Sequence, residues 1–416
     1  MRKLTSLLVI LVSLNVFGQE QITLYECYQL LDKNYPLAKQ TAILEKQQSI
    51  DLDAIKAESL PQLDLSAQAT YQSDVIEIPI SNAGIEPLNK DQYRTSLSAS
   101  QLIYGGGLIN AKNALNQSTL KTGKKTIEVN LYQLKKQVNQ IYFTVLLTQE
   151  KQQILTLKQD QLDAKLNEVR SGIKNGIVLP ASDKVLEAEL LKVKQQFTEL
   201  DQNKRSLIET LSSLIGKPLS NFTSFQESNI SIAPSIELNR PELELFELKK
   251  EEITSSEILF SKQKHPKLSG FAEGGYGNPG LNMLDNSFQP FYIAGIKLKW
   301  NVFDGNANKK HRESILINRD LVDNEMEIFK LNTNIELDQT QNEIDKISLL
   351  IETDKEIIAL RKDVLISAES QLKNGVITSS AYITELTNLY EDQNTLATHA
   401  IQLQLAKANY NITKGL

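Results

Sequence analysis

The segment Lys174-Asn175-Gly176-Ile177-Val178 recurs 199 residues later as Lys373-Asn374-Gly375-Val376-Ile377. Each copy follows a long polar segment with regularly spaced apolar residues, so each marks a turn between two long helices. Glycine at the third position favours such a turn because it adopts positive φ at little cost. The segment therefore predicts a chain that contains the same helical hairpin twice.

Further landmarks recur in the same order and indicate a duplication of the whole unit. They are Pro36 with Pro241, Pro61 with Pro266, the corner Ile103-Tyr104-Gly105-Gly106 with Val302-Phe303-Asp304-Gly305, and Gly216 with Gly415. The first two pairs are 205 residues apart and the later pairs 199, so a loop of the first copy holds six additional residues. We place the first repeat at 19–216, a connector at 217–238 and the second repeat at 239–416.

Each copy contains two segments in which apolar and polar residues alternate, most clearly between Gln62 and Gln72. This period of two predicts strands with one apolar face. The predicted strands are 62–77, 91–104, 267–277 and 291–303, with a loop at 78–90. The strand from Lys267 alternates poorly, so the sequence leaves its register open.

Aromatic residues gather near the predicted strand ends. Such a cluster is typical of an interfacial belt in a membrane protein, although aromatic residues also favour sheets in general. The cluster consists of Tyr71, Tyr93, Tyr104, Tyr276, Phe288, Phe291, Tyr292, Trp300 and Phe303.

The remaining segments have helical periodicity. One helix is predicted from about Thr23 to Ala57. Between Ile127 and Ile173, alternate steps of four and three residues meet apolar side chains at eleven of fourteen positions, a heptad seam that predicts coiled-coil packing. The predicted long helical hairpins are 108–215 and 306–412.

The N-terminal residues predict export. Arg2 and Lys3 precede the apolar run Leu4–Phe17, which is shorter than the ~20 residues of a spanning helix. We therefore expect a secretory signal peptide at 1–18, with a retained membrane anchor as the alternative. Cys27 is the only cysteine and follows no small residues, so we expect neither an intramolecular disulfide nor an N-terminal lipid.

The sequence contains no pattern typical of catalysis or metal binding. His265, His311 and His399 are scattered, without cysteine or carboxylate at metal-ligand spacing. Phosphate loops, nucleophile elbows and paired-carboxylate motifs are absent. The net charge is −6 without a basic stripe, which disfavours nucleic acid as a partner. We expect no enzyme activity, cofactor or bound metal.

One chain supplies only four amphipathic strands. Four strands cannot close a barrel, and an open edge in lipid leaves backbone groups unpaired; the smallest membrane barrels have about eight strands. If the strands span a membrane, several chains must share one barrel. The predicted fold class is therefore mostly α with a membrane β-barrel contribution, built from duplicated long α-helical hairpins and two β-hairpins.

The ordered, duplicated landmarks resemble the TolC family of outer-membrane efflux proteins over the whole mature chain. The residues that carry the resemblance are Thr23-Leu24, Glu26-Cys27, the segment 34–36, the corners at Gly105 and Asp304, the glycines Gly176 and Gly375, and Leu214-Ile215-Gly216-Lys217-Pro218-Leu219.

The resemblance implies a homotrimer with a twelve-stranded barrel in the outer membrane, a helical part in the periplasm, and the connector in an equatorial region. It implies a passive exit duct of a tripartite efflux or type I secretion system. The partners it implies are a periplasmic adaptor, an inner-membrane transporter and outer-membrane lipid.

The resemblance also implies that the hairpin turns form a periplasmic tip that contacts the adaptor and closes the channel. The corresponding residues here are Lys174, Asn175, Gly176, Asp183, Lys373, Asn374 and Gly375. Family members often carry arginine four residues before the turn glycine, where this chain has Gly172 and Gln371, and acidic residues where it has Ala381 and Thr384. A charged latch at these positions is therefore not expected. Asp183 is the remaining acidic candidate, or else a carboxylate favoured by the helix dipole.

Two other classes of protein remain open. A periplasmic adaptor or coiled-coil scaffold would also have a signal peptide and helical hairpins, but it should have a single hairpin flanked by compact β domains. A filament-type structural protein would not need two-faced strands with aromatic residues at their ends.

Overall fold

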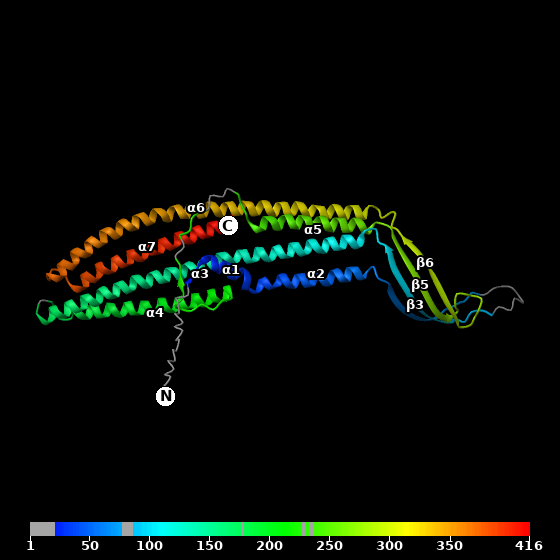
Figure 1. Ribbon diagram of the computed structural model, residues 1–416, viewed down its shortest axis with the longest axis horizontal. Coiled ribbons are helices and arrows are strands. Elements are labelled where there is room, and N and C mark those ends of the chain that lie inside the picture. The colour runs from blue at the N-terminus through cyan, green and yellow to red at the C-terminus, as the bar shows by residue number, and fades with distance from the viewer. Residues whose placement is uncertain (1–20, 77–85, 177, 227–228, 233–236) are drawn as a thin grey trace, which may run out of the picture. The chain divides into compact units, whose positions relative to one another are not determined.

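The computed structural model describes residues 21–76, 86–176, 178–226, 229–232 and 237–416 (Figure 1). The predicted signal peptide at 1–18 lies outside these residues, as do most of the predicted loop at 78–90 and part of the predicted connector at 217–238. No helix in the described part of the chain has the length and apolar character needed to cross a membrane.

The chain folds into two compact units, and each unit draws on both halves of the sequence. The helical unit contains the described residues up to Ala38 together with Asn130–Arg240 and Leu331–Leu416. The sheet unit contains Lys39–Val129 and Pro241–Lys330. The compact units therefore do not coincide with the predicted repeats at 19–216 and 239–416, because equivalent elements of the two repeats pack together.

The prediction of one helix from Thr23 to Ala57 is wrong. The structure has α1 at Leu24–Asn34, a 3₁₀ turn at Pro36–Ala38 and α2 at Lys39–Ala57. Tyr35 is extended, with ψ 138°, because a following proline disfavours the helical conformation and supplies no N–H. The start of α1 is fixed by a capping box, in which the Thr23 side chain accepts from the Glu26 N–H and Glu26 accepts from the Thr23 N–H at 2.8 Å.

Two helices of 67 residues dominate the structure. They are α3 at Leu108–Lys174 and α6 at Ala307–Lys373, whose ends are related by the 199-residue offset of the repeat. The other helices are α4 at Ser182–Ile215, α5 at Pro241–Gln263 and α7 at Ser379–Lys414. The second hairpin thus begins at Ala307 and ends at Lys414 rather than at the predicted 306 and 412, a difference typical of helix ends.

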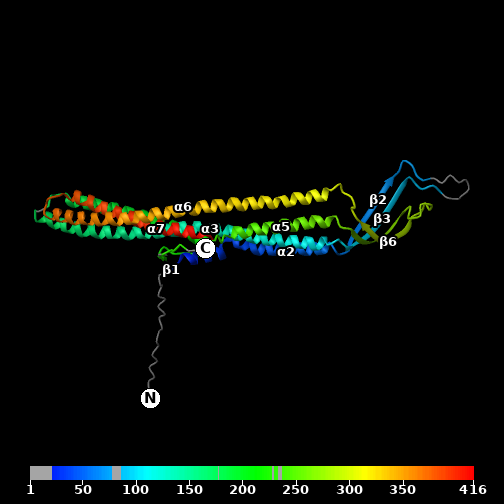
Figure 2. The ribbon, with the colours of Figure 1, turned by 90° about the horizontal axis from the view of Figure 1, so that it is seen from above.

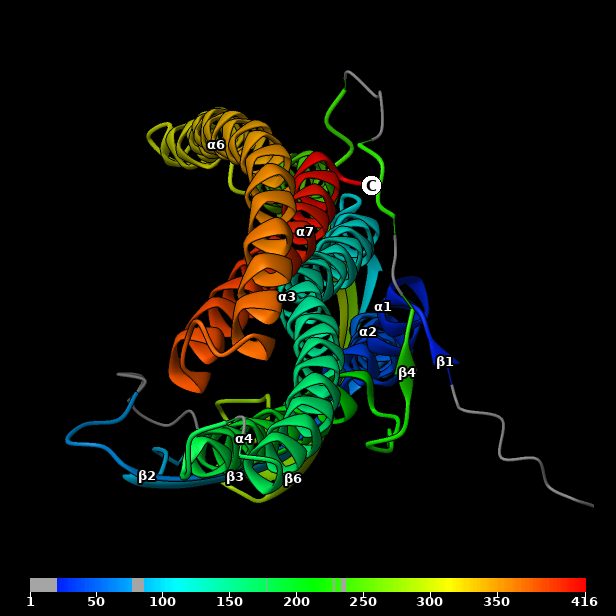
Figure 3. The ribbon, with the colours of Figure 1, turned by 90° about the vertical axis from the view of Figure 1, so that its left-hand side faces the viewer.

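The predicted heptad seam of α3 is confirmed. Nine of its eleven apolar residues are buried, and the other two, Leu134 and Ile173, are partly buried. Within the helical unit, β1 at Gln21–Ile22 pairs in parallel with β4 at Ser224–Phe225 (Figure 3). The buried Tyr142 hydroxyl of α3 lies 3.1 Å from the Ile22 carbonyl and 2.8 Å from the Gln226 carbonyl, so it fastens this small ladder to the core.

The sheet unit contains one antiparallel sheet of four strands in the order β2-β3-β5-β6. Figure 2 shows β2 beside β3. The strands are β2 at Gln62–Tyr71, β3 at Asp91–Tyr104, β5 at Lys267–Asn278 and β6 at Gln289–Lys299. The register of β5 is set by Lys267 opposite Lys299 and by Tyr93 opposite Asn278.

Two of the predicted strand ranges are wrong at their ends. The first strand stops at Tyr71 and not at 77, because its partner β3 begins at Asp91, directly opposite Tyr71. The last strand is Gln289–Lys299 and not 291–303, because its partner β5 begins at Lys267, directly opposite Lys299. Alternation continues beyond both ends in the sequence, but a strand needs a neighbour to bond with.

Candidate functional site

Both glycines of the predicted site end a long helix in the helical unit. Gly176 has φ +73° and Gly375 has φ +71°, and a Cβ on either would meet no atom within 4 Å. At the second turn the Gly375 N–H donates to the Leu372 carbonyl (3.0 Å) and the Val376 N–H donates to the Gln371 carbonyl (2.8 Å). This is a Schellman motif, which needs a left-handed residue at the glycine. The requirement at both positions is therefore conformational.

The two turns differ in how the next helix starts. Before α7, the Thr378 hydroxyl accepts from the Ala381 N–H at 3.2 Å, an N-cap that satisfies a backbone donor. Before α4, Ala181 has φ +74° and provides no side-chain cap. The first turn also packs closely on its own helix, since a Cβ at Gly172 would lie 2.6 Å from Val178 Cγ2. An arginine at position 172 is thus incompatible with this turn unless Val178 moves.

The charged and amide residues of the predicted site are mostly exposed. Lys174 and Lys373 occupy the last turns of α3 and α6, where positive charge is favoured by the helix dipole. The Asn374 side chain donates to the Ser370 carbonyl at 2.9 Å, while Asn175 is exposed. Asp183 lies in the first turn of α4, with Lys184 Nζ at 3.8 Å. Its position matches a carboxylate favoured by the helix dipole.

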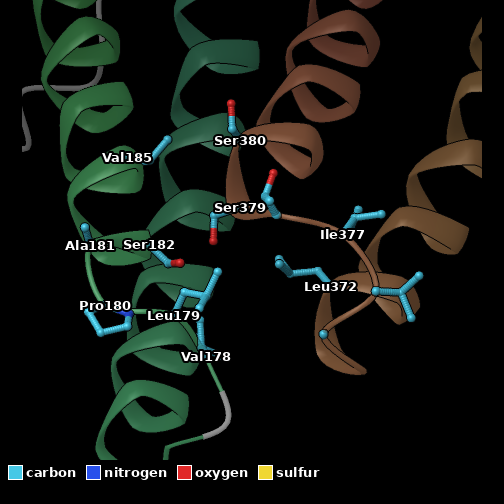
Figure 4. A pocket seen from close by; sticks show the side chains of 13 residues that line it. Val178, Leu179, Pro180, Ala181, Ser182, Val185, Leu372, Ile377, Ser379 and Ser380 are labelled. Carbon is cyan, nitrogen blue, oxygen red and sulfur yellow. The ribbon is translucent and has the colours of Figure 1, made fainter.

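A groove of about 340 Å³ separates the two turns, and its lining is largely apolar (Figure 4). Leu179 of the first turn and Leu372, near the end of α6, point toward each other, and Val178, Pro180 and Ile377 also line the groove. Of the predicted site residues, only Gly375 lines it; the others lie outside. The sequence therefore located the tip, around residues 174–183 and 373–382, but did not single out the apolar residues within it that line the groove.

Two buried lysines of α3 connect this helix to α4, α6 and α7. Neither lysine was predicted from the sequence. Lys158 Nζ donates to Glu189 of α4 at 2.8 Å and to the Thr387 hydroxyl of α7 at 3.3 Å. Lys165 Nζ donates to Glu168 at 2.7 Å and to Glu369 of α6 at 2.8 Å. The two side chains are 7% and 6% exposed. Each therefore ties both repeats together inside the helical unit.

The ion pairs shift the pKa values of their members in the expected directions. Burial lowers the pKa of Lys165, but its hydrogen bonds with Glu168 and Glu369 outweigh burial, and the pKa is raised. Burial raises the pKa of Glu189, but the hydrogen bond from Lys158 outweighs burial, and the pKa is lowered. Both residues are therefore held in their charged forms.

One sequence signal would have identified these lysines. Lys158 and Lys165 are seven residues apart, and each follows a seam leucine, Leu155 or Leu162, by three positions. A residue type that repeats with the heptad beside an apolar seam lies at the rim of the helix contact, where a long side chain reaches a partner helix.

The sheet has two chemically different faces. Directly opposed residues of neighbouring strands share a face, so the register places Leu65, Leu97, Gly274 and Tyr292 on one face. That face is apolar and exposed: Leu65 is 75% and Tyr292 83% exposed. Its further apolar and aromatic members are Leu63, Ala67, Ala69, Tyr71, Tyr93, Ala99, Leu268, Ala272, Tyr276, Ala294, Ile296 and Leu298.

The opposite face carries nearly all the charge of the sheet. Of the seven charged side chains in the four strands, only Asp91, at the start of β3, lies on the apolar face. The other six are Asp64, Arg94, Lys267, Glu273, Lys297 and Lys299. On this face the Ser66 and Ser96 hydroxyls are 3.0 Å apart, and the Arg94 guanidinium lies 4.3 Å from the centre of the Phe291 ring.

The structure revises the aromatic cluster predicted from the sequence. Tyr71, Tyr93, Tyr276 and Tyr292 lie on the apolar face toward the loop ends of their strands. Phe291 was grouped with them, but it is buried on the polar face, because a side chain next to Tyr292 in a strand points the opposite way.

Metal-binding clusters are absent from the described residues: no group of three or more histidine, cysteine, aspartate or glutamate side chains is placed to hold an ion. His399, on α7, instead lies 2.6 Å from Asp354 of α6 as an isolated pair.

Comparison with solved structures identifies the fold. The chain is similar to the outer-membrane protein VceC from Vibrio cholerae, with TM-score 0.65 and 15% identity over 94% of this chain and 96% of VceC. It is similar to the CmeC outer-membrane channel of Campylobacter jejuni, with TM-score 0.65 and 16% identity over 94% and 85%. CusC gives TM-score 0.69 and 14% identity over 94% and 92%.

No protein-family model matches the sequence, and no curated protein matches it either. The structural likeness extends over nearly the whole chain, and the chain therefore has the TolC-type fold of these outer-membrane channels.

Proposed function

We propose that this chain is the outer-membrane channel component of a tripartite efflux or type I secretion system. The observation that carries the proposal is the sheet, which exposes an apolar face and places six of its seven charged strand residues on the other face, in a chain of the TolC-type fold. An exposed apolar surface of this extent is costly in water and marks a surface that meets lipid or another protein.

The dimensions of the sheet suit a bilayer. Its strands are 10 to 14 residues long, and a tilted transmembrane strand needs ~9–11 residues. The tyrosines toward the loop ends of the apolar face suit the interfacial zone, where amphipathic rings are favoured. These features support an apolar face in outer-membrane lipid and a polar face toward an aqueous lumen.

A single chain leaves the sheet incomplete. In the described part of the chain, β2 and β6 each have only one neighbouring strand, and lipid does not tolerate an open edge. Pairing of β6 with β2 of the next copy in a homotrimer would close a twelve-stranded barrel. Assembly is therefore part of the proposed function.

The helical unit would extend the duct into the periplasm. Its groove between the hairpin turns, with the predicted site residues beside it, would contact a periplasmic adaptor that joins an inner-membrane transporter. Transport energy would come from that transporter, so the chain acts as a passive duct. The adaptor or coiled-coil scaffold class is less well supported, because the chain has two helical hairpins and one sheet built from both repeats.

The test is the native mass of the protein extracted from the outer-membrane fraction in mild detergent, followed by conductance in a planar bilayer. We expect an assembly of three chains that gives discrete current steps. Recovery as a periplasmic monomer would contradict the proposal. A second test is the variant Ala294→Pro in edge strand β6. Proline lacks a backbone N–H and disrupts strand pairing, so this variant should form less trimer.

A further inference from the structure

Three lysines occupy one end of the polar face of the sheet. Lys267 is the first residue of β5 and lies directly opposite Lys299, the last residue of β6. Lys297 lies two residues before Lys299 on the same face, opposite Ser269. The three side chains therefore form a compact group, the lysine cluster, at the end of the sheet where β5 follows α5 and β6 precedes α6.

No member of the lysine cluster forms an ion pair with another described residue. The two acids of the polar face, Asp64 and Glu273, share a level with Ser98, six residues along β5 from Lys267. At ~3.4 Å per residue that distance is ~20 Å, and from the level of Lys297, which is four residues from Glu273 along β5, it is ~14 Å. Both distances exceed the ~8 Å over which salt screens exposed charges.

The nearest acid beyond β6 is already engaged. Asp304 accepts hydrogen bonds from the Asn306 and Asn308 N–H groups, each at 3.1 Å, and Lys264 Nζ lies 3.4 Å from it. Hydrogen bonds from those groups lower its pKa and hold it as a carboxylate within its own corner. It is therefore not available to neutralise Lys297 or Lys299.

Like charges directly opposite each other destabilise a sheet. The pair Lys267 and Lys299 therefore destabilises the pairing of β5 with β6. Arg94 adds a fourth cation farther along the same face. Asp64 and Glu273 are the only acids among the strand residues of that face. Four cations and two acids give the polar face a net charge of +2 per chain. A water-filled passage lined by one sign of charge concentrates ions of the opposite sign.

We propose that the lysine cluster forms an anion-selective ring at the helix-proximal end of the barrel lumen, and that the duct carries anionic solutes. The inference rests on the proposed channel, in which three copies bring nine lysines to two adjacent levels at one end of the lumen. The ring attracts anions from the helical part of the duct and repels cations of similar size.

The test is the reversal potential of the purified trimer in a planar bilayer under a potassium chloride gradient at neutral pH. We expect chloride to be more permeant than potassium. In the triple variant K267Q/K297Q/K299Q the chloride-to-potassium permeability ratio should fall about tenfold. The matched variant K267R/K297R/K299R keeps the charges and should keep the ratio of the original protein.

All three proteins are compared as equal amounts of assembled trimer, so a folding defect is measured separately from selectivity. Preference for potassium in the unaltered protein, or an unchanged ratio in the glutamine variant, would overturn the anion-selective ring. A trimer that never conducts would instead overturn the channel itself.

Discussion

At the residue scale, Lys158 and Glu189 show how charge is used inside the helical unit. Their side chains are 7% and 11% exposed and lie 2.8 Å apart. Lys192 approaches the same carboxylate at 3.4 Å, but its side chain is 71% exposed. The same acid thus has one buried and one exposed partner, which allows a matched comparison.

We expect Lys158→Met to lower the free energy of unfolding by about 3 kcal/mol, because it leaves a buried carboxylate without its main partner. Lys192→Met should change it by about 0.5 kcal/mol or less, because exposed pairs contribute little. The double variant K158M/E189Q should be more stable than K158M. Urea unfolding followed by circular dichroism measures all three, and equal losses in K158M and K192M would contradict the account.

Residue types at special backbone positions were predictable, whereas residue contacts were not. Gly176 and Gly375 were expected to adopt positive φ and do so, because only the local chain sets that requirement. The role of Gly172 depends on Val178 folding back over the helix. The pairs of Lys158 and Lys165 depend on helices far away in the sequence. Local pattern alone does not encode such neighbours.

At the element scale, two hydrogen-bonded acids, the largely buried Glu189 and the half-exposed Glu336, make the packing of the helical unit dependent on pH. Glu189 joins α4 to α3, and Glu336 joins α6 to α3 through Lys136 and to the Thr413 hydroxyl of α7 at 2.9 Å. Burial raises the pKa of Glu336, but its hydrogen bonds with Lys136 and Thr413 outweigh burial and lower it. Glu189 behaves in the same way.

A carboxyl whose pKa is lower in the folded state than in the unfolded state stabilises the fold above its unfolded pKa. The ordinary value for glutamate is 4.5. The contribution of Glu189 and Glu336 should therefore be fully present at neutral pH and be lost as the pH falls below about 4.5. The measurement is the thermal unfolding midpoint against pH.

The variant E189Q/E336Q serves as the control for that measurement. It should be less stable at neutral pH and should lose less stability on acidification than the unaltered protein. Parallel curves for the two proteins would show that these acids do not carry the acid dependence. Lys165 is irrelevant in this range, because its raised pKa gives a contribution that is lost only at alkaline pH, above about 10.5.

The types of element could be predicted, but several of their ends could not. Periodicity identified the long helices and the four strands because each of these elements has one apolar face, whose residues recur at regular spacing in the sequence. The break at Pro36 was missed, although the residue before a proline disfavours helix. The ends of β2 and β6 depend on where their partner strands begin, which the sequence of one strand does not contain.

At the scale of the whole molecule, the sequence repeats and the compact units divide the chain differently. Each repeat contributes two strands to the sheet and a helical hairpin to the helical unit. A duplicated sequence therefore builds each unit from two equivalent halves. The sequence indicated the repeat, but only the pairing of β3 with β5 shows that the two β-hairpins form one sheet.

The central claim is that the apolar face of this sheet lies in lipid and the polar face in water. The most direct test is thiol labelling of single-cysteine substitutions at residues 63–68 of β2 in outer membranes, with a water-soluble maleimide. The natural Cys27 is fully buried, and burial raises the pKa of its thiol to about 12, so it provides a silent background.

We predict an alternating pattern: cysteines in place of Asp64, Ser66 and Gln68 are labelled, whereas those in place of Leu63, Leu65 and Ala67 are not. A thiol in lipid does not form the reactive thiolate, and a thiol on the lumen side does. Equal labelling at all six positions, as expected for a sheet surrounded by water, would contradict the account.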